Sequence, residues 1–439
     1  MDTRPNGAIQ TERSSKKGFK MGTATRADRW ARAIRGMGVA LIALLLVGCD
    51  GLLDVDLPTN VPEGVLTDPA MASTLVLSAQ GDFECALGEY IHSFGAWTDE
   101  LISAGGWLDT NAWVVRRSHD AEGGGGNCPT TLFRGNYNVY QPLQLARGQG
   151  ERAYGIISEH APGELPEDRE DLLARAAFYS AYATTHLGEA FCEMALDEGP
   201  IISPAEALAA AEARFSDAID HAQAAGNTEV MHAAQVGRAR VRLGMGDGAG
   251  AVADASAVPE GFVFYATYST SVARRSNHVY LNNNANEAVS VDPRYRNLEI
   301  DGVPDPRVPV RDTGGNGIDG TTPMWVQEKY TSLGDDIPLA TWEEAQLIIA
   351  EAQGGQAAVD AINRLRQAAE LPLFESSDEA EIRAEMIEER RRELFLQGNR
   401  IGDMLRLGLP FDTGSDHKGQ AYVEDATCMP LPVAETQNM

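Results

Sequence analysis

The sequence lacks the short motifs by which many enzyme sites are found. An H-E-x-x-H zinc signature, a G-x-S-x-G nucleophile turn, a P-loop and a G-x-G-x-x-G at the start of a helix are all missing from its 439 residues. Its eight histidines are scattered, and no spacing of carboxylates singles out an acid pair for glycoside hydrolysis. We therefore expect neither catalysis nor a cofactor.

Positive charge is also scarce. The chain has 36 Lys and Arg against 64 Asp and Glu, a formal net charge of −28, which excludes nucleic acid as a partner. Only Lys329 and Lys418 are lysines beyond residue 48, so nearly all later cations are arginines. An acidic chain can collect Ca²⁺, and Asp312, Asn316 and Asp319 could surround an ion. The EF-hand pattern is missing there, however, and a solvated loop is the preferred interpretation.

Hydrophobic runs are short. VALIALLLV, which begins at Val39, has nine residues. It is too short to span a bilayer and fits the apolar part of a secretory signal in residues 1–48. It leads into LVGC, which resembles a lipobox, so we expect Cys49 to be acylated and the acidic residues 49–67 to be a tether. The alternative is a short buried helix with an unmodified cysteine.

Cysteine is rare, with five in the chain. The four after Cys49 show no C-x-x-C spacing, and in an exported chain this favours disulfides over a metal site. Three pairings are possible. We favour Cys85–Cys128, which closes a loop within the N-terminal segment, and Cys192–Cys428, which ties the tail to the helical body; free buried thiols are the alternative.

Helical patterns dominate the rest of the sequence. Apolar residues follow helical spacing from about 68 to 103, whereas 104–135 is rich in glycine and is expected to be a loop. Amphipathic segments resembling tetratricopeptide hairpins follow at about 171–257 and 341–397. Between them, 259–340 is rich in Asn, Pro, Gly and Asp, as expected of surface loops with a short β-hairpin. We predict one mainly α-helical domain over 68–439.

Motifs near the C-terminus make the prediction more specific. From Lys329 onward the chain contains, in order, AEA, AINRLRQAAELPLF, ERRRELFLQGNRIGDMLR and PLPVAETQN. This order resembles the RagB/SusD family of outer-membrane nutrient-binding lipoproteins, and CDGLLDVDLP after the acylation site resembles the acidic start of such proteins. Departures from the family pattern are Gln397 in place of glutamate, Asn399 in place of histidine, and Ile401-Gly402 in place of an aromatic pair.

The resemblance implies a SusD-like fold, an outer-membrane lipoprotein facing the exterior, and no enzymatic activity. It also implies capture of an oligomeric nutrient, expected to be a glycan, and its delivery to a SusC-like TonB-dependent barrel. Two other functions remain open. One is a lipid-anchored hydrolase of the same polymers, and the other is a tetratricopeptide adaptor that binds peptides.

Candidate ligand-binding residues cluster in WTDELISAGGWLDTNAW. Trp97, Trp107 and Trp113 could stack on sugar faces, and Asp99, Asn111 and Arg116 could bind hydroxyls or a charged group. Trp107 follows two glycines and is the one most expected to be exposed, whereas core packing is the alternative for Trp97. In the resembled family the cleft also uses loops after the helical hairpins. Here these loops offer Tyr280, Asn282, Asn283, Tyr295 and Trp325, of which Trp325 also suits the core.

The arginine-rich segment near residue 390 is expected to be a structural brace. Ile382, Met386, Leu394 and Phe395 form an apolar helical stripe that includes Arg390, so its guanidinium should pair with a carboxylate. Further pairs are expected from i+4 and i+3 spacing among Glu388, Arg392, Arg400, Asp403 and Arg406. A permanently charged planar fork suits such a brace better than lysine does.

Overall fold

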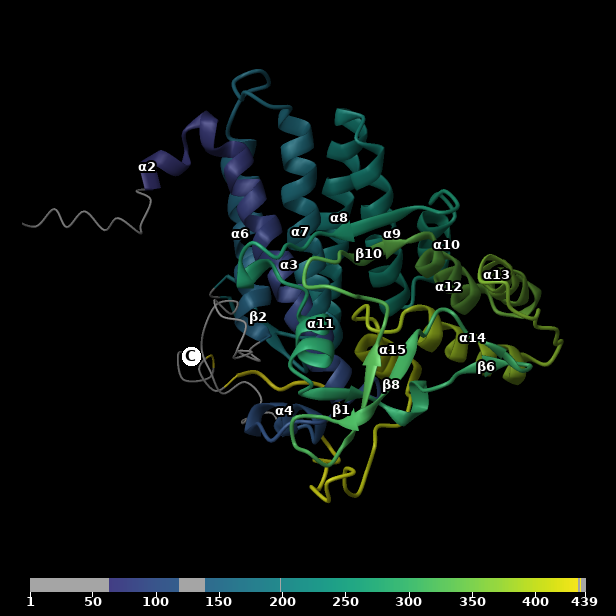
Figure 1. Ribbon diagram of the computed structural model, residues 1–439. Helices are drawn as coiled ribbons and strands as arrows, with labels where there is room; N and C mark the ends of the chain where they lie inside the picture. The colour runs from purple at the N-terminus through teal and green to yellow at the C-terminus, as the bar shows by residue number, and fades with distance from the viewer. Residues whose placement is uncertain (1–62, 118–138, 198, 433–434, 436–439) are drawn as a thin grey trace, which may run out of the picture. The chain divides into compact units, whose positions relative to one another are not determined.

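Long helices standing side by side make up most of the computed structural model (Figure 1), which describes residues 63–117, 139–197, 199–432 and 435. All of the described residues lie in one unit that starts at Glu63. Its helices are α2 (Glu63–Leu66), α3 (Ala72–Trp97), α4 (Leu108–Val114), α6 (Tyr140–Ser158), α7 (Arg169–Ala190), α8 (Pro204–Ala225), α9 (Thr228–Gly244), α10 (Gly248–Ala255), α11 (His278–Tyr280), α12 (Trp342–Gln353), α13 (Gly355–Ala368), α14 (Glu379–Glu393) and α15 (Arg400–Leu407).

The first layers pack as antiparallel helix pairs. α3 packs against α6 and α7, and α7 packs against α8. α8 in turn packs against α9, and α9 packs against α10. Small residues permit these close contacts: a Cβ added at Gly150 on α6 would lie 2.9 Å from Ser180 on α7. The start of α8 is a capping box, in which Ser203 Oγ accepts from the Glu206 amide and the Glu206 carboxylate accepts from the Ser203 amide.

A second group of helices follows from residue 342. α12 pairs with α13, and α14 packs against both. Thr341 caps α12, and Asp378 caps α14, with its Oδ1 accepting from the Ala380 and Glu381 amides. The mainly helical architecture predicted from the sequence is confirmed in the described residues.

Strands are short and form antiparallel pairs. The pairs are β1 (Leu101–Ser103) with β5 (Val289–Val291), β2 (Met194–Ala195) with β3 (Ile201–Ile202), β4 (Val263–Ala266) with β10 (Ile337–Thr341), β6 (Glu299–Ile300) with β7 (Val303–Pro304), and β8 (Val310–Asn316) with β9 (Pro323–Gln327). The β8–β9 hairpin lies in the segment expected to be loop-rich. The β1–β5 pair joins that segment to the residues just after α3.

One part of the expected loop at 104–135 is instead the helix α4. It forms because Ala112, Trp113 and Val114 are buried and their burial fixes the turn against the core. A disulfide joins Cys192, after α7, to Cys428 in the C-terminal tail. Cys85 is also disulfide-bonded, and its expected partner Cys128 lies outside the described residues.

Cys49 and most of the expected tether likewise lie outside the described residues. Within the part of the chain that the structure describes, every helix is either too short or too polar to cross a lipid bilayer.

Candidate functional site

The arginine-rich segment is tied together by buried ion pairs, and we call Glu388, Arg390, Arg392, Arg400, Asp403 and Arg406 the brace. Arg390 donates from Nε and Nη2 to the two oxygens of Asp403, at 2.9 and 2.6 Å, and both side chains are buried. Burial raises the pKa of Asp403, but Arg390 and Arg406 outweigh it and hold this pKa well below its usual range. The carboxylate therefore stays charged inside the protein.

Other members of the brace reach distant parts of the chain. Arg392 contacts Glu388 at 2.8 Å and Asp305 at 3.2 Å, and Arg406 bridges Asp403 and Glu351. Lys329 completes the C-terminal end of α14, where its Nζ donates to the carbonyls of Glu393 and Phe395 at 3.3 and 3.0 Å. Burial lowers the pKa of Lys329 to about 8.

Arg400 takes Asp99 as its partner, with two hydrogen bonds of 2.6 Å between buried groups. This contact contradicts the prediction that Asp99 binds a ligand, because its carboxylate is already used in the core. Next to it, Glu100 accepts from the Leu396 amide at 2.7 Å. Burial raises the pKa of Glu100 to about 7. Asp99 and Glu100 thus join the end of α3 to the brace.

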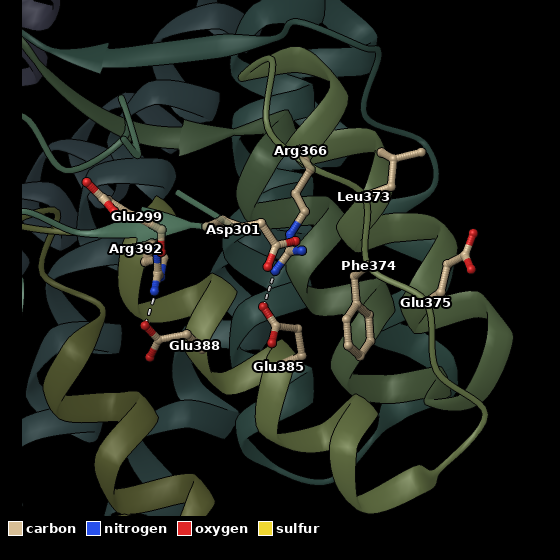
Figure 2. Close-up of a pocket in the computed structure, with 10 residues that line it drawn as sticks. Glu299, Asp301, Arg366, Leu373, Phe374, Glu375, Glu385, Glu388 and Arg392 are labelled. Carbon is tan, nitrogen blue, oxygen red and sulfur yellow. Dashed lines mark hydrogen bonds and ion pairs between the residues drawn. The ribbon is translucent and has the colours of Figure 1, made fainter. Parts of the chain in front are cut away.

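A pocket of about 550 Å³ lies beside the brace (Figure 2). Arg366 points at Glu385 and Arg392 points at Glu388, so both guanidinium groups in this pocket are already paired. Its remaining charged lining residues are Glu299, Asp301 and Glu375. This pocket is the surface of a structural ion network, and its excess of carboxylates leaves little to select a particular ligand.

Two of the tryptophans predicted to bind a ligand are in the core. Trp97 and Trp113 are fully buried, with ring centroids 5.6 Å apart in an edge arrangement, and the Trp97 indole donates to the Thr427 carbonyl at 3.1 Å. The structure contradicts the prediction for both, because neither ring face is open to a ligand. Trp97 lies three residues after Phe94 on α3, a helical spacing that signals a packed pair, and Phe94 also contacts Trp113 on α4.

Arg116 is also buried, against the prediction that it meets a ligand. Its Nη2 donates to the Asp412 carbonyl at 2.5 Å, and its guanidinium lies 5.5 Å from the Phe411 ring and 4.7 Å from the Tyr422 ring. Burial raises the pKa of Tyr422 to about 12. Arg116 holds the C-terminal tail to α4, so its role is structural.

The polar residues predicted in the 280s are used internally as well. Asn283 donates to the Val289 carbonyl at 2.8 Å and accepts from the Gln327 amide at 2.7 Å, and Asn282 donates to His278. These buried side chains satisfy the irregular backbone around them, which contradicts their predicted ligand role. The remaining aromatics differ: Tyr295 is buried against Phe395, whereas Tyr280 and Trp325 are partly buried, the latter under the Arg296 guanidinium.

Among the predicted ligand residues that the structure describes, Asn111 lines an open cavity, and Trp107 follows Gly106, another residue that lines it. Trp107 is the partly exposed N-cap residue of α4, and Asn111 lies one turn later. The cavity, which we call the hollow, has a volume of about 620 Å³ and is formed by three segments distant in sequence. Its lining residues are Gly105, Gly106, Asn111, Asp319, Thr321, Thr322, Pro323, His417 and Lys418.

Backbone hydrogen bonds hold two of these segments together. The Ala104 amide donates to the Ala288 carbonyl, and the Ala104 carbonyl accepts from the Asp319 amide, both at 2.9 Å. The two loops approach so closely that a Cβ at Gly317 would lie 2.7 Å from the Ala104 oxygen. A glycine is therefore required at this contact.

Lys418 brings in the third segment. Its Nζ donates to Asp319 Oδ2 at 2.7 Å, to the Gly105 carbonyl at 2.6 Å and to Ser103 Oγ at 3.1 Å. Asp319 also accepts from the amides of Thr321 and Thr322 and from the Thr322 hydroxyl. Burial raises the pKa of Asp319, but Lys418 and these hydrogen bonds outweigh it and keep the pKa well below its usual range.

This pairing bears on the calcium interpretation. Asp319 is taken by Lys418, the Asn316 amide nitrogen donates to the Gly320 carbonyl, and Asp312 accepts from the Gly314 amide. Over the described residues no group of three or more His, Cys, Asp or Glu is arranged to hold a metal ion. Lys418, His417 and Thr321 line the hollow but were not among the predicted ligand residues. The one feature of the sequence that could have pointed to Lys418 is the scarcity of lysine.

Comparison with known proteins agrees with this architecture. Residues 344–428 match the SusD family, which confirms the resemblance read from the sequence motifs. A solved SusD-like carbohydrate binding protein from Bacteroides vulgatus has a TM-score of 0.62 and 13% identity, over 83% of this chain and 95% of that one. Surface glycan-binding protein A from Bacteroides thetaiotaomicron, solved with laminarihexaose, has a TM-score of 0.61 and 11% identity, over 84% and 97%. No curated protein is a significant match.

Proposed function

We propose that this SusD-like protein captures a glycan at the cell surface and passes it, chemically unchanged, to a TonB-dependent barrel of the SusC kind. The hollow carries the proposal, because it is an open cavity of suitable size on a fold shared with proteins described as glycan-binding. Cavities of a few hundred Å³ with a few well-placed polar groups are typical of small-ligand sites.

The walls of the hollow suit sugar hydroxyls. Asn111 offers its amide nitrogen, Thr321 its hydroxyl and His417 a ring nitrogen, all of which can form hydrogen bonds with hydroxyl groups. Trp107 follows directly after the lining residue Gly106 and keeps part of its side chain exposed. Its indole is the group that we propose to stack on a sugar ring.

Capture without conversion is part of the proposal. Hydrolysis of a glycosidic bond ordinarily uses a pair of carboxylates on either side of the bond. Asp319 supplies the one carboxylate among the described lining residues, and its oxygens already accept several hydrogen bonds. A hydrolase would need a second carboxylic acid in the hollow, and it would need Asp319 without its present hydrogen-bond partners.

Attachment and delivery rest on the sequence motifs and on the family match. Acylation of Cys49 would add more than one lipid chain, which is enough for stable membrane attachment. The proposed anchor faces the cell exterior, where a barrel partner could receive the ligand. Cys49→Ala should then yield protein that no longer sediments with outer membranes.

The deciding experiment is calorimetry of the purified protein with a panel of oligosaccharides, combined with product analysis and with recovery of partners from native membranes in mild detergent. We expect binding to at least one glycan, no turnover, and co-purification of a large barrel. Turnover would favour the hydrolase alternative. Binding of peptides but not glycans would favour the adaptor alternative and contradict the proposal.

A further inference from the structure

We propose that the hollow selects neutral glycans and discriminates against carboxylated or sulfated ones. The inference rests on the proposed function and deepens it by naming the ligand class. It comes from the hydrogen-bonding state of the two residues of fixed charge in the hollow, Asp319 and Lys418, which neutralise each other before any ligand arrives.

The cation has no donor left. An ammonium group has three N–H donors. Those of Lys418 are matched by Asp319 Oδ2, the Gly105 carbonyl and Ser103 Oγ, at 2.7, 2.6 and 3.1 Å. Only 18% of the Lys418 side chain is exposed. A ligand carboxylate or sulfate would have to displace one of these partners to bind the ammonium.

The anion is equally occupied. A carboxylate has about four acceptor sites on its two oxygens. Asp319 Oδ1 accepts from the Thr321 and Thr322 amides at 2.9 and 2.8 Å, and Oδ2 accepts from Thr322 Oγ1 and Lys418 Nζ, both at 2.7 Å. The side chain is 11% exposed. The ion pair is therefore saturated at both ends and offers a ligand neither a free cation nor a free anion.

The groups that remain in the hollow are polar, and they include an amide and an imidazole. Asn111 Oδ1 accepts from Ser103 Oγ at 2.6 Å, and this hydrogen bond does not use the Asn111 amide hydrogens. His417 uses Nε2 with the Thr322 hydroxyl at 3.2 Å. These groups can exchange hydrogen bonds with hydroxyls, whereas a ligand anion would lose its hydration shell without gaining a counter-charge. The chain's net charge of −28 opposes anions further.

The test uses two panels of oligosaccharides of similar length. The neutral panel contains laminari-, cello-, malto-, manno- and xylo-oligosaccharides, and the anionic panel contains oligogalacturonate, oligoalginate and sulfated carrageenan oligomers. We expect neutral binding, and affinities for the anionic panel weaker by about tenfold or more. The preference should persist at about 0.5 M sodium chloride, where repulsion by the distant surface charge is largely screened.

A charge variant tests the ion pair itself. Asp319→Asn keeps a side-chain oxygen for the Thr321 and Thr322 amides but leaves the Lys418 charge uncompensated, so the ratio of anionic to neutral affinity should rise about tenfold. Asp312→Asn is the matched control. It makes the same change in net charge in the same hairpin, but Asp312 pairs with no lysine in the described contacts.

Each outcome decides a different question. Wild-type binding of anionic probes as tight as neutral ones, weakened by Lys418→Gln, would overturn the neutral preference and leave the proposed function standing. An equal gain in Asp312→Asn and Asp319→Asn would also overturn it, because the effect would then be general. Failure of both panels to bind would overturn the proposed function itself. If Asp319→Asn does not fold, the wild-type panels and Lys418→Gln still decide.

Discussion

The brace and the hollow use charged residues in different ways. In the brace, every cation is an arginine and each is paired with at least one carboxylate, so ion pairs tie α14 and α15 to each other and to distant parts of the chain. In the hollow, Lys418 and Asp319 form an ion pair that holds three loops in place. The charged residues therefore have a structural role in both regions.

The largest expected effect comes from opening the brace at its centre. Arg390→Ala leaves Asp403 charged and buried with only part of its compensation, and breaking such a pair typically costs about 3–5 kcal/mol. We expect a clear fall in the free energy of unfolding, measured by denaturant titration, with glycan affinity of the folded fraction unchanged.

The control for that variant is Arg383→Ala on the same helix. Arg383 is exposed and makes one long hydrogen bond of 3.5 Å to the Leu407 carbonyl. Its loss should cost less than about 1 kcal/mol. Lost glycan binding in Arg390→Ala without lost stability would show that the brace is a binding site and would abolish the contrast between the two regions.

The disulfide gives the next largest effect. Cys192 and Cys428 enclose most of the helical body, with a sequence separation of 236, and removing a native disulfide typically costs about 2–5 kcal/mol. The double Cys→Ser variant should unfold at lower denaturant. Because His417 and Lys418 of the hollow lie in the tail that Cys428 ties to the helical body, we also expect weaker glycan binding, which the brace variant should not show.

A pH-dependent effect is expected at Glu100, between the two regions. Burial raises the pKa of Glu100 from 4.5 to about 7, so the folded protein holds a proton that the unfolded chain releases. Between about pH 4.5 and 7 this residue therefore lowers stability as the pH rises, by at most about 3 kcal/mol.

Glu100→Gln should remove that contribution. The difference in unfolding free energy between the variant and the wild type should grow from pH 5 to pH 8 in favour of the variant, as measured by denaturant titration at each pH. Glu328→Gln, which changes an exposed carboxylate in a surface ion pair, is the control. A difference that does not vary with pH would mean that Glu100 ionises normally.

The smallest expected effect sharpens the site itself. Trp107→Ala should weaken glycan binding several-fold, about 1 kcal/mol, without changing stability, because its indole is partly exposed. Trp113→Ala should do the reverse, since Trp113 is fully buried and such truncations typically cost about 3–5 kcal/mol of stability. Unchanged binding in Trp107→Ala would show that the ligand does not stack on Trp107.

The same comparison explains what the sequence could predict. The pairs Glu388–Arg392 and Asp403–Arg406 are three or four residues apart on a helix, so helical geometry alone brings them together. The run Ser203-Pro204-Ala205-Glu206 is likewise a local capping signal, and α8 begins at it. Local spacing carries this information, and the helical architecture follows from many such signals.

The candidate site could not be predicted in the same way. Lys418 meets Asp319 across about a hundred residues and Gly105 across more than three hundred, and Asp99 meets Arg400 across a similar distance. No local pattern distinguishes a buried tryptophan such as Trp113 from a partly exposed one such as Trp107 six residues earlier. The tertiary fold decides which polar and aromatic residues remain available.

The rarity of lysine has a practical consequence. Beyond residue 48 the two primary amines of the side chains report on the two regions separately, Lys329 at the end of α14 and Lys418 in the hollow. Reductive methylation followed by mass spectrometry would therefore read local opening of each region on its own peptide. Saturating glycan should slow modification of Lys418 and leave that of Lys329 unchanged. The wild-type chain would then report on the hollow and on the end of α14 in one experiment.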